Sequence, residues 1–313
     1  MKSTNKYLDI TNRKTDYEWI HKETFRTELG FRAISIMYDD HSNDKNSYEN
    51  ILKLKDNIQY RLFAATHQYL VFLKELSSAE SYLQKLYQDD PNKLTGFIYK
   101  NPYFDKIEQE LSSIFDNIIF HVSSIFDYIS HIICYIIFKN KSNTVYWSKL
   151  TRAARGQNND FCNEEMKKII DTVDRRFVNK LYDYRSRLLH NIRNKHDFGG
   201  YRIFSNSQFI LQLQPSEICL KYFKLIAEDI SADSKFTLTY LSSWIIKRTF
   251  IEIEAILDVL AKEIKKNSYF GNNLYNPKRG MQSLLIVSIN PETNTAEPVS
   301  EKLWKEYKTS ASR

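Results

Sequence analysis

The residues best suited to chemistry lie in the segment Tyr184-Arg185-Ser186-Arg187-Leu188-Leu189-His190-Asn191-Ile192-Arg193. A histidine titrates near neutral pH, so His190 could accept a proton from a ribose 2′-hydroxyl or donate one to a leaving 5′-oxygen. An arginine matches phosphate oxygens with two N–H groups, so Arg185 could stabilise the charge that develops on a phosphate. The pair therefore predicts metal-independent RNA cleavage that leaves a 2′,3′-cyclic phosphate and a 5′-hydroxyl.

The spacing of the two residues places a condition on this chemistry. Five residues of an ideal helix give about 140° of rotation and about 7.5 Å of rise, so Arg185 and His190 do not share a face. They can meet at one phosphate because arginine is long, or because a second copy of the helix faces the first. The neighbouring polar side chains are expected to hold the RNA backbone, namely Ser186, Arg187, Asn191 and Arg193.

Helical periodicity predicts the elements that position this segment. Apolar residues recur at steps of three and four over four long stretches, and the second of these is apolar around much of its circumference. A short helix is expected to end near Ala154, and the first-turn signals of Pro215-Ser216 predict another. The four long helices are expected at residues 47–88, 103–138, about 164–194 and 235–266.

Two smaller features complete the expected fold. Tyr201-Arg-Ile-Phe and Phe209-Ile-Leu-Gln-Leu flank Ser205-Asn206-Ser207 and predict a β-hairpin over residues 200–214. The fold class is thus mainly α: an antiparallel helical bundle with a small β-hairpin insertion and an irregular C-terminal tail. The expected domains are an N-terminal helical region, the helical domain with its hairpin, and a tail with one strand near Ser283–Ile289, at residues 1–100, 101–267 and 268–313.

The positive charge of the chain is concentrated in one stretch. The net charge is +7, and residues 139–202 alone hold 15 Lys or Arg against 7 Asp or Glu. The remainder of the chain is therefore close to neutral. A concentration of this kind favours a polyanionic partner, with RNA as the expected one, over a merely solubilising charge. A membrane surface is not expected, since no basic amphipathic terminus accompanies the stretch.

Several classes of protein do not fit the sequence. Three widely spaced cysteines, at 134, 162 and 219, argue against a disulfide framework and a zinc finger. No Gly-rich phosphate loop and no Gly-x-Ser-x-Gly segment is present, and no cofactor is expected. The N-terminus has no apolar signal segment, and the longest clean apolar run, Ile132–Phe138, is too short to span a bilayer. A cytoplasmic location is expected.

The Arg-x4-His motif in a late helix of a helical bundle resembles the HEPN superfamily, which is defined by an Arg followed four to six residues later by a His. The resemblance covers about residues 103–265, and Arg185 and His190 match the two defining positions. It implies a metal-independent endoribonuclease of a toxin–antitoxin or antiviral defence system. It also implies that the active site lies at a homodimer interface, and that an antitoxin or another defence protein is a partner. It also suggests that Asp127, on the preceding core helix, positions the motif.

Alternatives to this interpretation remain open. Active HEPN members commonly have Asn, Asp or His directly after the Arg, where this chain has Ser186, and some relatives are non-catalytic nucleic-acid or nucleotide-binding modules. Asp127 could simply pair with His131 within its helix. Metal binding by His121, Asp127 and His131 is rejected, because their spacing does not place all three on one face. Arg61 and His67 also fit the loose spacing, and we treat them as coincidence.

The aromatic residues of the hairpin allow two uses. Tyr201, Phe204 and Phe209 could stack on RNA bases, although packing in the core is the commoner use of such residues. A third functional hypothesis, a purely structural helical scaffold, leaves the concentration of charge unexplained.

Overall fold

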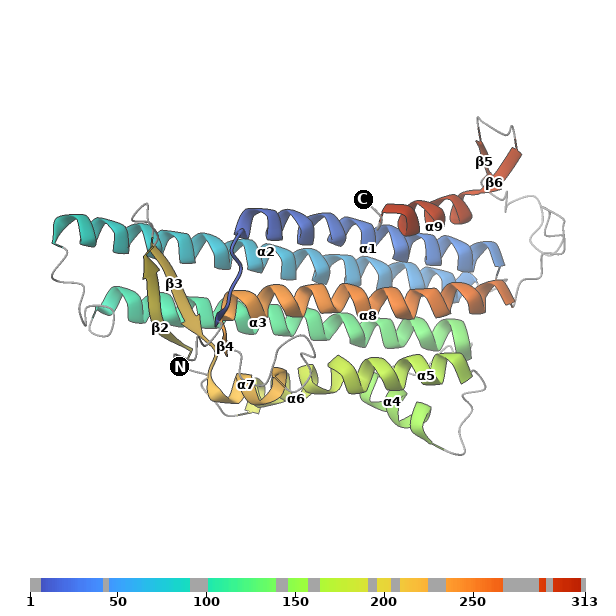
Figure 1. The fold of residues 1–313 in the computed structure, drawn as a ribbon. Coiled ribbons are helices and arrows are strands. Elements are labelled where there is room, and N and C mark those ends of the chain that lie inside the picture. The colour runs from blue at the N-terminus through green and yellow to red at the C-terminus, as the bar shows by residue number, and fades with distance from the viewer. Residues whose placement is uncertain are drawn as a thin grey trace, which may run out of the picture. The chain divides into compact units, whose positions relative to one another are not determined.

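The computed structural model describes the chain in ten stretches: residues 7–41, 45–90, 101–138, 146–156, 164–190, 196–203, 209–224, 235–266, 287–290 and 295–310. Helices dominate them (Figure 1). The helices are α1 (Arg13–His41), α2 (Lys45–Asp89), α3 (Pro102–Ile133), α4 (Trp147–Arg155), α5 (Glu164–Val173), α6 (Asn179–His190), α7 (Glu217–Phe223), α8 (Leu238–Lys266) and α9 (Val299–Thr309). The strands are β1 (Tyr7–Leu8), β2 (Asp197–Ile203), β3 (Phe209–Gln214), β4 (Lys235–Phe236), β5 (Val287–Asn290) and β6 (Thr295–Pro298). The mainly α fold with a small hairpin is therefore confirmed.

Two of the long helices contain π-helical turns. One, Cys134–Phe138, continues α3, and the other, Asp174–Val178, joins α5 to α6. The predicted third helix is thus one long element with a widened turn inside it. Turns of this kind often lie at functional sites.

The chain forms two compact units, each assembled from three stretches. Unit 1 consists of Met1–His21, Phe63–Ser123 and Arg176–Arg248, and unit 2 consists of Lys22–Leu62, Ser124–Arg175 and Thr249–Arg313. Both units draw on residues before and after position 100, so they divide the chain along different lines from the predicted domains. The candidate motif at residues 185–190 belongs to unit 1.

Unit 1 has an apolar core of helix faces. Burying such faces is the main source of stability for helices in water. Its fully buried side chains come from α2, α3, α6 and α8, at positions three and four residues apart: they include Tyr69, Phe72, Leu76, Leu111, Phe115, Ile118, Leu181, Leu241 and Ile245.

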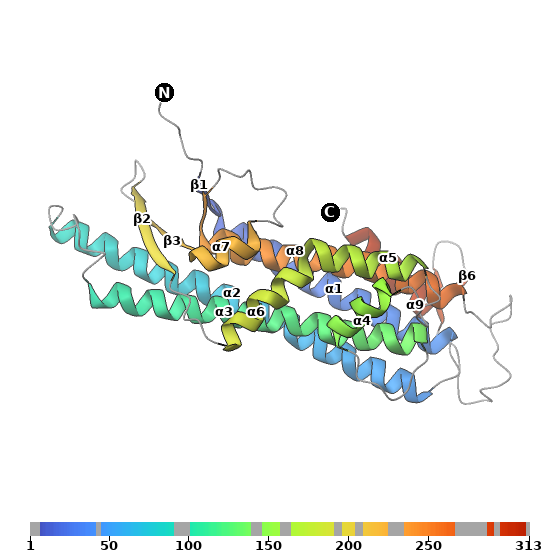
Figure 2. The ribbon, with the colours of Figure 1, turned by 90° about the horizontal axis from the view of Figure 1, so that it is seen from below.

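The β2–β3 hairpin of unit 1 is held by two carboxylates. The backbone N–H of Phe198 donates to Glu108 of α3 at 2.7 Å, and that of Leu211 donates to Glu80 of α2 at 2.9 Å. Figure 2 shows the hairpin beside the ends of these helices. The strands are antiparallel, and their register shifts between Phe198 and Gly200. The predicted hairpin is confirmed, although its first strand begins earlier than expected, at Asp197.

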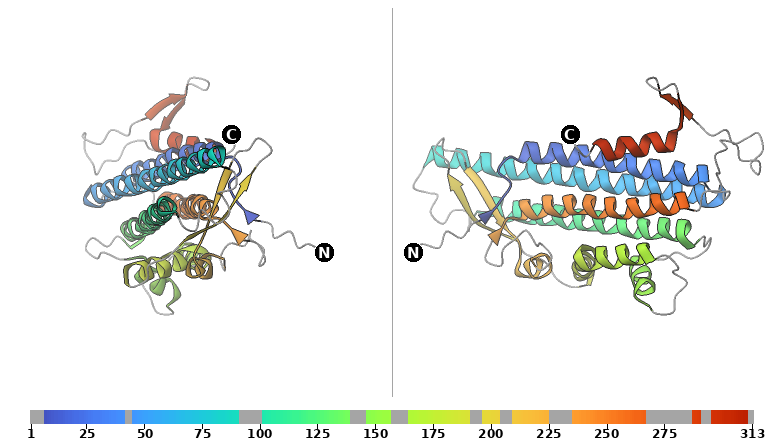
Figure 3. Two further views of the ribbon diagram at one scale, coloured as in Figure 1. Left: turned by 90° about the vertical axis from the view of Figure 1, so that its left-hand side faces the viewer. Right: turned by 45° about the vertical axis from the view of Figure 1, so that its right-hand side comes forward.

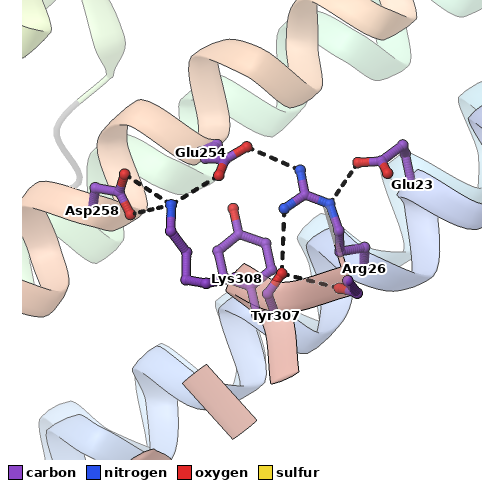
Figure 4. A network of polar contacts seen from close by, with 7 residues as sticks. Glu23, Arg26, Glu254, Asp258, Tyr307 and Lys308 are labelled. Atoms are coloured by element: carbon purple, nitrogen blue, oxygen red, sulfur yellow. Dashed lines mark hydrogen bonds and ion pairs between the residues drawn. The ribbon is translucent and has the colours of Figure 1, made fainter. Parts of the chain in front are cut away.

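The C-terminal helix of unit 2 is docked by a partly buried ion-pair network (Figure 4). Arg26 of α1 donates to Glu23 at 2.6 Å and to Glu254 of α8 at 2.9 Å, and Lys308 of α9 donates to Glu254 at 2.8 Å and to Asp258. Tyr307, only 1% exposed, has its ring 4.8 Å below the Arg26 guanidinium. Burial opposes the charge of Arg26, but the hydrogen bonds to Glu254 and Glu23 outweigh it and raise its pKa.

The end of the chain is therefore more regular than the sequence predicts. The antiparallel pair β5–β6 leads into α9, which lies along α1 (Figure 3). The strand predicted near Ser283–Ile289 corresponds to β5, and residues 283–286 lie outside the described residues. The predicted irregular tail was wrong for residues 295–310, because burial of Tyr307 and the ion pairs of Lys308 hold them in place.

The helix that begins at Pro102 is the most apolar element. With its π-helical continuation to Ile137 it is long and apolar enough to cross a membrane by length and composition alone, contrary to the expectation from its broken apolar runs. However, 61% of its most apolar window is buried within the protein, which is the arrangement of a core helix in a water-soluble fold.

Candidate functional site

Helix α6 carries the predicted motif in unit 1. Its buried side presents Leu181 and Tyr184, which anchor it, while Ser186 and His190 are exposed. His190 is the last residue of the helix, one turn beyond Ser186, so both polar side chains face the same side. The imidazole is thus accessible to a ligand in solution.

Arg185 lies on a different side of α6 from His190, as the helical spacing requires. Its side chain is half-buried, and its guanidinium lies 5.7 Å from the centroid of the Tyr182 ring, in cation–π contact. The hydroxyl of Tyr182 in turn donates to the backbone oxygen of Ser123 on α3 at 3.1 Å. A guanidinium held over a fixed ring loses less conformational freedom on binding a phosphate than a free side chain would.

Arg187 is also held in a defined position. Its Nε donates to the hydroxyl of Tyr222 on α7 at 2.6 Å, and its guanidinium lies 5.8 Å from the centre of that ring. Tyr222 packs edge-on against Tyr184. Nothing in the sequence marks Tyr182 or Tyr222 as supports of these arginines, since the two tyrosines resemble the other aromatic residues of the bundle.

The other predicted site residues cannot be joined to this group. Asn191 and Arg193 lie outside the described residues. Asp127 lies in unit 2, half-buried on α3, and acts on His131: burial lowers the pKa of His131, and the charge of Asp127 opposes this. The intrahelical interaction with His131 is therefore present, whereas a role for Asp127 in positioning the motif stays a prediction.

A buried polar group that the sequence did not reveal lies behind α6. Tyr184 is hydrogen-bonded to Cys219 of α7, and burial raises the pKa of both well above their usual values. Burial also raises the pKa of Asp116, on α3, to about 7. Its Oδ1 atom is buried without a hydrogen-bond partner among the residues that the structure describes. The carboxyl of Asp116 is therefore largely neutral below pH 7.

His196 is a second buried titratable group of unit 1. It is 1% exposed, its ring packs edge-on against Phe115, and its Nδ1 accepts the backbone N–H of Ser216 at 2.9 Å. Burial lowers its pKa to about 4, so the imidazole is neutral at physiological pH. His196 thus helps to position the start of α7 and is not exposed for catalysis.

Part of the basic stretch is neutralised within unit 2. Arg155 donates to Asp171 and Asp174, each at 2.6 Å, and Arg175 donates to Asp171 at 2.9 Å. Both arginines are engaged in ion pairs, so the charge available to a ligand is smaller than the count of 15 basic residues suggests.

The remaining candidates have simpler roles. His67 is exposed on α2, and Arg61 of the same helix lies in the other unit. Phe209 is buried and packs edge-on against Tyr87, which confirms core packing for it. The side chains of Tyr201 and Phe204 lie outside the described residues. Within the described stretches, no group of three His, Cys, Asp or Glu side chains could hold a metal ion.

The arrangement offers one accessible imidazole and two ring-supported guanidiniums on a single helix. Such a set can bind phosphate and move protons. Comparison with protein-family models, with curated proteins and with solved structures gave no match to the chain.

Proposed function

We propose that this chain is a HEPN-like, metal-independent endoribonuclease that acts as a cytoplasmic homodimer in a toxin–antitoxin or antiviral defence system, together with a partner protein of that system. Two copies of α6 would face each other, so that Arg185 of one copy and His190 of the other reach the same phosphate. The resemblance of the motif to the HEPN family and the concentration of basic residues support this proposal.

The main support for the proposal is that the two motif residues lie on different sides of α6 and differ in their exposure. His190 is exposed at the end of α6, while Arg185 is half-buried on another side and rests on the Tyr182 ring. One helix therefore does not present both groups side by side. A second copy supplies the missing group, and the burial of the interface would exclude water from the charges.

The reaction follows from these groups. One His190 imidazole takes the proton of the ribose 2′-hydroxyl, and the 2′-oxygen attacks the adjacent phosphorus. Arg185 stabilises the added negative charge on the phosphate oxygens. The bond from phosphorus to the 5′-oxygen then breaks, and the same His190, now protonated, donates its proton to that oxygen. The products are a 2′,3′-cyclic phosphate and a 5′-hydroxyl.

The test is cleavage of a labelled RNA in excess EDTA. The wild-type chain should cleave and leave 3′ ends that resist phosphatase until the cyclic phosphate is opened. His190→Ala should lose at least about 100-fold in rate, the usual contribution of a general acid or base. His67→Ala is the matched control, since it removes an exposed histidine from another helix, and it should cleave normally. Equal rates for the two variants would contradict the proposal.

A non-catalytic binding module is the second candidate, and Ser186 favours it. This exposed residue follows the motif arginine, where active HEPN members commonly have a stronger hydrogen-bonding or ionisable group. The binding module predicts salt-dependent RNA binding that is weakened by Arg187→Ala, with no cleavage at any protein concentration.

A further inference from the structure

Helix α4 of unit 2 presents a row of one aromatic and two basic side chains that the motif does not use. Tyr146, Lys149 and Arg152 are three residues apart and all are exposed, Tyr146 by 56% of its surface. Tyr146 is the extended N-cap residue of α4, and Lys149 and Arg152 lie about 4.5 Å apart along the helix that follows it, so the three exposed side chains follow one another at intervals of about one turn. No acidic residue occurs between Tyr146 and Gly156.

The opposite side of α4 is firmly attached to the rest of unit 2. The indole N–H of Trp147 donates to the buried carboxylate of Asp174 at 2.9 Å, and its ring packs edge-on against Phe126. At the other end of the helix, Arg155 donates to both Asp174 and Asp171. Leu150, between them, is 1% exposed. The helix is therefore fixed at both ends, and the exposed row is presented on a rigid support.

The two acidic residues that bond to α4 are already engaged. Asp171 and Asp174 both accept hydrogen bonds from Arg155, and Asp174 also accepts from Trp147. Asp174 and Asp171 thus hold the two ends of α4 through Trp147 and Arg155, while Lys149 and Arg152 are exposed between these ends. This division of roles explains why only part of the basic stretch is needed for folding.

We propose that Tyr146, Lys149 and Arg152 form a binding surface for single-stranded RNA, separate from the Arg185 and His190 motif. Lys149 and Arg152 contact successive parts of the phosphate backbone, and a base stacks on the Tyr146 ring. Cations that follow a backbone beside an exposed aromatic ring are the common arrangement for binding single strands. The choice of RNA over DNA rests on the proposed function, whereas the binding surface itself does not.

A single strand fits this row better than a duplex does. Stacking on Tyr146 requires a base whose face is free, and bases inside a duplex are already stacked on each other. The row also offers only two cations, which suits a local contact with a flexible strand. The same bases in a perfect duplex should therefore bind more weakly.

The experiment measures binding of a fluorescent single-stranded RNA to the full chain carrying His190→Ala, so that the RNA stays intact. The double variant Lys149→Ala/Arg152→Ala is compared with Arg32→Ala/Lys53→Ala, which removes the same charge from exposed positions on α1 and α2 of the same unit. Anisotropy titrations over a range of salt give the slope of log K against log salt. Removing two phosphate contacts should make this slope less steep by about 1.4.

Tyr146→Ala tests the stacking contact independently. It should weaken binding by about tenfold while leaving the salt slope unchanged, because stacking releases no counterions. Tyr146→Phe keeps the ring and should bind as the parent does. Circular dichroism of all variants checks that the helices are intact.

The outcomes separate this inference from the proposed function. If the wild-type chain cleaves RNA but Lys149→Ala/Arg152→Ala has the same affinity and salt slope as the control, the α4 surface is wrong and the nuclease stands. If no cleavage occurs but the double variant binds more weakly with a reduced slope, the surface stands and the nuclease is wrong. Failure of the parent chain to bind single-stranded RNA, or tighter binding of a duplex, overturns the inference.

Discussion

Replacing Asp116 by asparagine should change the way in which stability depends on pH. Asp116 lies on α3 behind the motif helix, and burial raises its pKa from 3.8 to about 7. The groups that face it are Tyr184 and Cys219, which burial keeps neutral. No cation has been found to compensate a charge on Asp116 in the described part of unit 1. The protonated carboxyl is therefore the form that the fold prefers.

The sign and size of the effect follow from the two pKa values. Because the folded-state pKa is higher than the unfolded one, the stabilising contribution of Asp116 is complete below about pH 4 and is lost as the pH rises through 7. A shift of about three units corresponds to at most about 4 kcal/mol. Asp116 is only half-buried by surface area, so a loss of about 2 kcal/mol between pH 4 and pH 8 is the working figure.

The assay compares the urea concentrations at which half of the wild type and half of Asp116→Asn are unfolded. Unfolding is monitored by circular dichroism at pH 5 and at pH 8. The variant should unfold at a higher urea concentration than the wild type, and the difference between the two midpoints should be clearly larger at pH 8 than at pH 5, where only part of the loss has occurred. His196 has a pKa lowered to about 4 and changes stability in the opposite direction, but it is present in both proteins and cancels in the difference. Asp183→Asn, at an exposed position on α6, controls for loss of a carboxylate.

An offset between Asp116→Asn and the wild type that is the same at pH 5 and pH 8 would refute this reasoning. It would mean that the Asp116 carboxyl is solvated or paired, so that burial does not hold it neutral. A variant less stable than the wild type at pH 8 would refute it equally.

Two further predictions concern unit 2. A Cβ atom on Gly30 would lie 3.0 Å from both Leu257 and Tyr307, so Gly30→Leu should force α9 away and cost about 1–3 kcal/mol of stability, seen as a lower urea midpoint. Gly30→Ala should be far milder, because its gain in helix propensity offsets the tight contact. Asp174→Ala leaves the Trp147 indole N–H without its hydrogen-bond acceptor. It should lower the free energy of unfolding by about 1–3 kcal/mol and shift the Trp147 fluorescence emission to longer wavelength. An unchanged emission spectrum would show that this hydrogen bond does not hold α4.

Periodicity was enough to predict the long helices whose buried faces are mainly apolar. The predicted stretches 47–88, 103–138 and 235–266 agree with α2, α3 and α8 to within about three residues, apart from the π-helical turn at the end of α3. Serine at position 216 also caps α7, accepting the backbone N–H of Cys219 at 3.2 Å. Local side-chain patterns determine such elements, so they can be read from a single chain.

Helix α1 was not predicted as a separate element, because it buries charged residues as well as apolar ones. Asp16, Glu23 and Arg26 are less than 9% exposed, which breaks the apolar pattern. Their partners are far away in the sequence: Lys247 for Asp16, and Glu254 for Arg26. The same holds for α9, whose Lys308 pairs with α8. Spacing within one helix contains no information about such partners.

The candidate site was predictable in its motif but not in its supports. The Arg-x4-His spacing identified Arg185 and His190, and helix geometry predicted that they lie on different sides of α6. The sequence could not reveal that Tyr182 and Tyr222 hold the arginines, since those contacts depend on how α6 packs against α3 and α7. Nor could it separate Arg155 and Arg175, which pair with Asp171 and Asp174, from the other cations of the basic stretch.

The central claim is that one Arg185 and one His190 from different copies act on the same phosphate. Its most direct measurement mixes the two inactive variants Arg185→Ala and His190→Ala and follows RNA cleavage in excess EDTA. Each variant alone should be inactive and the mixture should regain activity, because a mixed dimer holds the intact arginine of one copy opposite the intact histidine of the other. A mixture as inactive as its components, under conditions where mixed dimers are demonstrated, would contradict it.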